Sequence, residues 1–168
     1  MDLILDILLR KEDFKKLNII ELFNEWGGEK IPHEPRKYKF NSKLVFHLNI
    51  DINYYSNIIQ DDIDVEEFIS LSLEGNSLLE LEIMVNKGKK HLPESELIIF
   101  LNELYNSLEE VCIVKLLNEE RIDEKHIIND TKKAIDVFIN SLDWKSPKGI
   151  VITKRLDKSI DMIEECQF

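Results

Sequence analysis

The chain has 168 residues, of which 43% are hydrophobic and 33% charged, and its formal net charge is −11 at pH 7. This length and apolar content suit one domain, residues 1–168, with a core of its own, and exclude a disordered chain. The negative charge argues against nucleic acid as a partner, because nucleic-acid binding needs a basic surface. Two cysteines are too few for a disulfide-rich secreted fold, so Cys112, which stands in an apolar run, is expected to be a buried thiol.

The apolar start of the chain is expected to be neither a signal peptide nor a membrane span. Acidic residues stand where a signal peptide carries basic ones, and no small-residue cleavage site follows. No stretch of the sequence reaches the roughly 18 apolar residues that cross a bilayer. We therefore expect a cytoplasmic protein that does not bind membranes.

Residues 2–26 are predicted to form two helices, the second of which buries Phe14, Leu17, Ile20 and Phe23. A Gly-Gly pair then ends the second helix, as glycine just past a last turn usually does. Two prolines in the following segment, at residues 31–35, disfavour helix before them and indicate a loop.

Two β-hairpins are predicted next, because apolar and polar residues alternate with a period of two. In the first, a three-residue loop at 41–43 sets Tyr38 opposite Phe46. In the second, a three-residue loop at 75–77 sets Leu71 opposite Leu81. Such alternation is typical of an antiparallel sheet with one covered face and one solvated face. The polar face is expected to carry His47, Asn49, Asp51, Ser70, Ser72, Glu74, Glu80 and Glu82.

The second half of the chain is predicted to be mainly helical. Pro93–Glu96 is a typical helix entry, and Leu97–Leu117 is apolar around most of its circumference, which indicates one long buried helix. A further helix begins near Asn129 or Asp130, and a strand follows at Ile150–Thr153. The apolar stripe of that helix, and the apolar positions of a short final helix, are Ala134, Ile135, Phe138, Ile139, Leu142 and then Leu156, Ile160, Ile163.

This order of elements predicts an α+β fold, in which helices pack on one face of an antiparallel sheet of hairpins.

Charge is distributed unevenly along the chain. Residues 44–86, here named the acid-only segment, contain no Lys or Arg and carry −9 of the net charge of −11. Clustered carboxylates steer a basic partner and raise its association rate, but acid-rich surfaces also serve solubility, so both interpretations stay open. If the segment binds a partner, we expect the contacts to come from His47 and from the nine acids Asp51, Asp61, Asp62, Asp64, Glu66, Glu67, Glu74, Glu80 and Glu82.

Motifs for metal, phosphate or nucleophilic chemistry were not found in the sequence, so we predict no cofactor and no metal. Asp62, Asp64 and Glu66 resemble the start of a calcium loop, but its glycine and its final glutamate are missing. The glycines form no phosphate-binding pattern. Cys112 stands among apolar residues, where a thiol is expected to be inert.

Arg121 and His126 show an R-x4-H spacing that resembles the ribonuclease motif of HEPN-type helical domains. The resemblance implies that these two side chains act on an RNA backbone, and it makes a small ribonuclease the enzymatic alternative.

The sequence favours a protein-binding inhibitor over an enzyme. Its most concrete form is a bacterial immunity protein or antitoxin that neutralises a basic protein toxin, such as a nuclease, through an acidic surface. The two alternatives are the small ribonuclease with Arg121 and His126, and a non-catalytic adaptor or structural subunit. The identity of the partner and the oligomeric state stay open at this point.

Overall fold

The computed structural model describes residues 3–16, 29–30, 37–39, 45–49, 68–73, 95–117, 121–143 and 145–154. These residues form an eight-stranded sheet with the strand order β2-β3-β4-β5-β1-β6-β8-β7, and three helices. The strands are β1 Leu3–Arg10, β2 Glu29–Lys30, β3 Lys37–Lys39, β4 Val45–Asn49, β5 Phe68–Leu73, β6 Val111–Leu117, β7 Glu124–Ile127 and β8 Ile150–Lys154. The helices are α1 Lys11–Lys16, α5 Glu96–Ser107 and α6 Thr131–Ser141.

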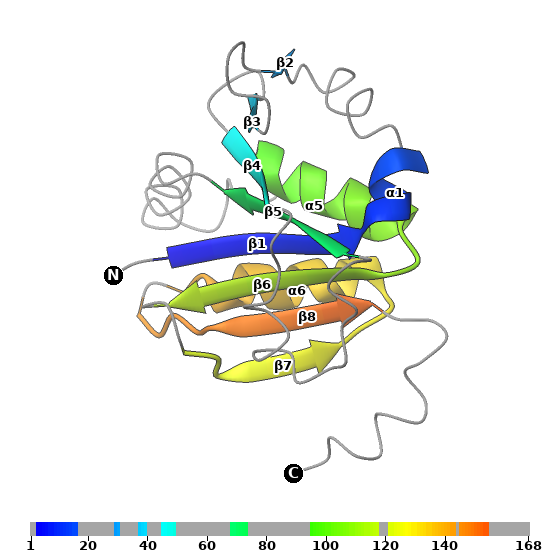
Figure 1. Cartoon of the computed structure of the whole chain (residues 1–168). Helices are drawn as coiled ribbons and strands as arrows, with labels where there is room; N and C mark the ends of the chain where they lie inside the picture. Colours follow the sequence, from blue (N-terminus) through cyan, green and yellow to red (C-terminus); the bar gives the residue numbers. More distant parts are fainter. Residues whose placement is uncertain are drawn as a thin grey trace.

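The predicted α+β class is confirmed. Neighbouring strands are antiparallel throughout the sheet, except for the parallel pair β7 and β8. Helices α5 and α6 lie behind the sheet in Figure 1, on the same face. They enclose the larger core with apolar side chains from β1, β5, β6 and β8, among which Ile7, Leu71 and Ile113 are almost fully buried.

Strand β1 corrects the prediction of helix for residues 3–10, whereas α1 agrees with the prediction at Lys11–Lys16, and residues 17–26 lie outside the described residues. Strand β1 lies in the middle of the sheet, between β5 and β6, where Ile7 pairs with Leu71 on one side and with Ile113 on the other. Leu5, Ile7 and Leu9 enter the helix-covered core, and Leu8 enters a second cluster on the opposite face. A strand that is buried on both faces has a continuous apolar sequence without alternation, and periodicity does not distinguish it from a buried helix.

The predicted entry of the helix that follows Pro93 is confirmed, but its predicted length is wrong. Ser95 is the N-cap of α5, and its Oγ accepts a hydrogen bond from Ile98 N at 3.3 Å. The helix ends at Ser107, and Val111–Leu117 form β6 instead. All seven residues of β6 are buried and all but Lys115 are apolar, so the sequence of this strand resembles that of a buried helix.

Helix α6 and strand β8 agree with the sequence prediction. Asp130 is the N-cap of α6, and its Oδ1 accepts a hydrogen bond from Lys133 N at 2.7 Å. The predicted stripe packs onto the sheet, with Ala134 and Phe138 completely buried. Strand β7 had no prediction of its own, because its four residues are mostly polar. The predicted final helix after residue 154 lies outside the described residues.

The first hairpin has the predicted register, whereas the second does not. Tyr38 of β3 pairs with Phe46 of β4, as the three-residue loop requires. Leu71 of β5 pairs with Leu48 on one side and with Ile7 on the other, so the predicted pairing of Leu71 with Leu81 is wrong. A strand has only two hydrogen-bonding edges, and both edges of β5 are already occupied at Leu71.

The face of the sheet away from α5 and α6 is not the solvated polar surface that the alternation indicated. It carries a second buried apolar cluster, formed by Leu8, Cys112, Val114, Leu116 and Val151. Ser70 and Asp6 pair with members of this cluster and are 0% and 1% exposed.

Among the described helices, none is long and apolar enough to cross a membrane.

Candidate functional site

The nine acids of the acid-only segment lie outside the residues that the structure describes. The backbone of the tenth predicted contact residue, His47, lies in β4. There it pairs with Lys37 of β3 on one side and with Ser72 of β5 on the other. Asn49 of β4 likewise pairs with Ser70. The predicted polar positions His47, Asn49, Ser70 and Ser72 are therefore brought together as direct cross-strand partners.

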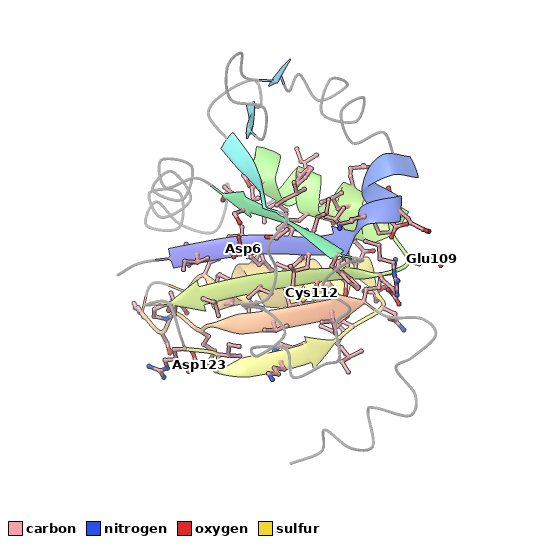
Figure 2. The ribbon with its side chains drawn as sticks, in the orientation of Figure 1. Asp6, Glu109, Cys112 and Asp123 are labelled. Atoms are coloured by element: carbon pink, nitrogen blue, oxygen red, sulfur yellow. The ribbon has the colours of Figure 1, made fainter. Side chains whose placement is uncertain are left out.

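This polar row continues into β1, where the sequence had predicted a helix. Ser72 pairs with Asp6, so Lys37, His47, Ser72 and Asp6 occupy one register line across four neighbouring strands. Asp6 is labelled on β1 in Figure 2. Ser70 Oγ lies 3.4 Å from Ser72 Oγ. The buried Asp6 therefore lies beside a strand that carries two hydroxyl side chains. The signal in the sequence for this buried polar position was an acidic residue within an apolar run. It was not used, because the run was predicted to be a helix.

Arg121 and His126, the R-x4-H pair, lie on extended backbone and not on a helix. Arg121 forms a bridge to Leu117, and His126 belongs to β7. The two side chains bind different carboxylates. Arg121 Nε lies 2.7 Å from Asp123 Oδ1, and His126 Nε2 lies 3.0 Å from Glu124 Oε2. The helical context of the HEPN-type motif is therefore not present at these residues, and nothing in their contacts favours RNA cleavage.

The carboxylates beside this pair are held by neighbours at the sheet end that Figure 2 marks with Asp123, opposite the end with Glu109. Asp123 Oδ2 accepts a hydrogen bond from Gly149 N at 2.8 Å, which lowers the pKa of Asp123, with a further contribution from Arg121. Glu124 accepts hydrogen bonds from Lys148 and from His126, which lower its pKa. The same contact with Glu124 raises the pKa of Lys148. These ion pairs fasten β7 to the segment before β8, which is a structural role.

Lys115 is a buried cation in the helix-covered core. It points from β6 to the end of α6, where its Nζ donates a hydrogen bond to Ser141 O at 2.5 Å, and its exposure is 0%. A cation suits this place because the C-terminal end of a helix carries partial negative charge. Burial nevertheless lowers the pKa of Lys115 to about 8, against an opposing contribution from Asp123.

The folded protein should therefore become more stable with rising pH above about 8, relative to a variant without this amine. The unfolded chain keeps the ordinary lysine pKa and binds more protons than the folded chain between about pH 8 and 10.5, so the free energy of unfolding rises across that window. Between pH 8 and 9.5 we expect the free energy of unfolding, measured in urea, to rise by on the order of 1 kcal/mol more for the natural chain than for Lys115→Met.

The exposed Lys145→Met variant should follow the natural chain at every pH in this range. Burial raises the pKa of Tyr105, whose hydroxyl donates to Ile128 O, so this phenol titrates above the window. If the free energy of unfolding changed with pH in the same way for the natural chain and Lys115→Met, the pKa of Lys115 would not be lowered in the folded protein.

A groove of about 620 Å³ lies between α5 and α6, and all of its lining residues are described. Its floor is apolar and includes Ile98, Ile135 and Ile139. Its walls are polar, with amide, hydroxyl and charged side chains from both helices and from the residues before α6. They are Asn102, Asn106, Asn129, Asp130, Thr131, Lys132 and Asp136. We name this feature the α5–α6 groove. No local pattern in the sequence marks this groove, because it forms between two helices that are far apart in the chain.

One sequence prediction on chemistry has a counterpart in the described residues. Cys112 is buried in β6, with 8% exposure, as its apolar neighbours predicted. Within the described ranges, no group of three or more His, Cys, Asp or Glu side chains is placed to hold a metal ion.

Comparison of the chain with protein-family models, with curated proteins and with solved structures found no match. Its function must therefore be argued from its own residues. The features that carry such an argument are the charge of the acid-only segment and the α5–α6 groove.

Proposed function

We propose that the chain is a protein-binding inhibitor. In its most concrete form it is a cytoplasmic immunity protein or antitoxin that neutralises a basic protein toxin through the acid-only segment. The observation that carries the proposal is the nine carboxylates of this segment, with no Lys or Arg between Leu44 and Asn86. A run of one sign attracts a partner of the opposite sign and rejects partners of the same sign.

The strand topology supports this proposal because most of the acids of the segment fall in the connection between two neighbouring strands, β4 and β5. β4 and β5 are neighbouring antiparallel strands, with Asn49 paired to Ser70. The connection at residues 50–67 therefore begins and ends at one end of the sheet. This connection contains six of the nine acids, which are Asp51, Asp61, Asp62, Asp64, Glu66 and Glu67. Six of the nine carboxylates therefore belong to one connection between two neighbouring strands.

The charges of the described residues support the same assignment by contrast. Basic side chains are about as numerous as acidic ones there, and several form local ion pairs, such as Arg10 with Glu110 and Lys148 with Glu124. Paired charges exert little long-range attraction, because their fields cancel. The excess of negative charge that steers a basic partner is therefore contributed by the acid-only segment.

The test first searches the genes next to the gene of this chain for a basic domain that is toxic when expressed in cells, and then mixes this purified toxin domain with the chain. We expect a 1:1 complex whose formation slows with added salt, and rescue of cells that express the toxin domain. The double variant Asp61→Lys with Asp62→Lys should weaken the complex at least about tenfold, since charge pairs that become buried at an interface are costly to break. Isothermal titration calorimetry and stopped-flow association rates measure the two effects.

A matched control changes the net charge of the chain by the same amount elsewhere. Glu103 and Glu109 are exposed and lie outside the acid-only segment, so Glu103→Lys with Glu109→Lys should leave the affinity within about twofold of the natural chain. Equal losses in both double variants would show a dependence on total charge alone. Full affinity in the Asp61 and Asp62 variant would reject the assignment.

A further inference from the structure

The α5–α6 groove has a closed end and a defined direction. Thr131, the first residue of α6, donates a hydrogen bond from Oγ1 to Asn106 Oδ1 at 2.7 Å, near the end of α5. From there the groove follows α5 back to Ile98 and α6 forward to Ile139. Eight residues of helix correspond to about 12 Å, which is the length of about four residues of extended chain.

The two asparagines on the α5 wall leave complementary groups available to a ligand. Asn102 donates from Nδ2 to Ile98 O at 3.0 Å, and Asn106 accepts at Oδ1 from Thr131. No hydrogen bond from a described residue reaches Asn102 Oδ1 or starts from Asn106 Nδ2. One asparagine thus offers an acceptor and the other a donor, which are the groups that match a peptide N–H and a peptide C=O.

The spacing of these two groups suits an extended backbone. Residues four apart on a helix are about 6 Å apart along its axis. In an extended chain, the N–H and C=O groups that point to one side repeat every second residue, at about 6.6 Å. Asn102 and Asn106 can therefore contact consecutive same-side positions of one strand that runs along α5.

The charged residues that line the groove favour a strand with basic side chains. Its lining contains two carboxylates, Asp130 and Asp136, and one ammonium group, Lys132. Asp136 is exposed and makes no ion pair with any described residue. The lining is thus negative overall, and the whole chain at −11 adds attraction for a cationic ligand.

We propose that the α5–α6 groove binds an extended, lysine- or arginine-containing segment of a partner protein. Asn102 and Asn106 bind its backbone, and Asp136, with Asp130, binds a basic side chain. This surface is separate from the acid-only segment, because none of its lining residues belongs to residues 44–86. The groove therefore adds a second contact to the inhibitor proposed above and stands without it.

The test uses the full chain, labelled with ¹⁵N, and a short peptide of alternating lysine and threonine, since threonine favours extended backbone. We expect this peptide to shift the side-chain amide signals of Asn102 and Asn106 and the backbone signals of residues 131–139. The same peptide with glutamate in place of lysine should shift none of them. Asn102→Ala, Asn106→Ala and Asp136→Asn should each weaken binding about three- to tenfold.

Two control variants lie on the same helices outside the lining. Asn140→Ala and Glu103→Gln change exposed residues of α6 and α5, and they should bind the lysine peptide as the natural chain does. The proposal is overturned by an absence of shifts, by equal binding of the glutamate peptide or of lysine amide alone, or by full affinity in both asparagine variants. Shifts confined to residues 44–86 would also overturn it, while supporting the acid-only segment as a binding surface.

Discussion

Gly149→Ala is expected to lower the free energy of unfolding by about 3 kcal/mol or more, a large loss for one methyl group. An added Cβ at Gly149 would lie 1.8 Å from Arg121 O and 2.9 Å from Arg121 C. Both are backbone atoms, so no rotation of a side chain relieves the clash. The constraint is steric, and only a residue without a side chain allows the two segments to approach so closely.

The contacts that would break explain the size of this effect. Gly149 O accepts hydrogen bonds from Asp123 N at 2.8 Å and from Glu124 N at 3.2 Å, and Gly149 N donates to Asp123 Oδ2 at 2.8 Å. Moving Arg121 away would stretch all three and separate β7 from β8.

Urea unfolding of Gly149→Ala against the natural chain measures the loss. Ser146→Ala, at an exposed position of the same loop, should change stability by less than about 0.5 kcal/mol. If Gly149→Ala changed stability as little as Ser146→Ala, the close approach of Gly149 to the backbone of Arg121 would be contradicted.

Phe138→Ala should cost about 3 to 5 kcal/mol, the range for removing a buried phenyl ring. Phe138 is 0% exposed and lies on the face of α6 that packs into the helix-covered core. The loss combines the transfer of the ring to water with the cavity that remains, because close-packed neighbours collapse only in part.

The loss of stability in Phe138→Ala comes from the core and not from a lower helix propensity. Alanine is the best helix former, so the backbone of α6 gains from the change and the whole loss is assigned to the core. Phe138→Leu should recover more than half of the stability by filling most of the volume. Asn140→Ala, at an exposed position of the same helix, should lie within about 0.5 kcal/mol of the natural chain in the same urea experiment. A loss below about 1.5 kcal/mol for Phe138→Ala would contradict the packing of α6 on the sheet.

The candidate sites were predictable to different degrees. The period-two pattern placed His47, Asn49, Ser70 and Ser72 on one polar face, whereas the direct pairing of β4 with β5 was decided by the tertiary structure. Asp6 was missed, because its place beside Ser72 depends on β1, which the sequence presented as helix. The α5–α6 groove was missed as well, since it forms only where two helices far apart in the chain lie side by side.

Amphipathic elements could be predicted from the sequence by itself, because each buries one face and exposes the other. The stripe of α6 with its cap Asp130, the cap Ser95 of α5, and the register of Tyr38 with Phe46 are of this kind. In each of them the local pattern states which side is buried and where the element begins.

Only the tertiary structure decided that the two central segments of the chain, β1 and β6, are strands and not helices. β1 and β6 carry apolar residues on both faces, beside the buried Asp6 and Lys115, so their sequences have no period that separates strand from helix. What makes them strands is pairing with partners up to about a hundred residues away, such as Ile7 with Ile113. That pairing satisfies their backbone groups inside the core, and no local stretch of sequence encodes it.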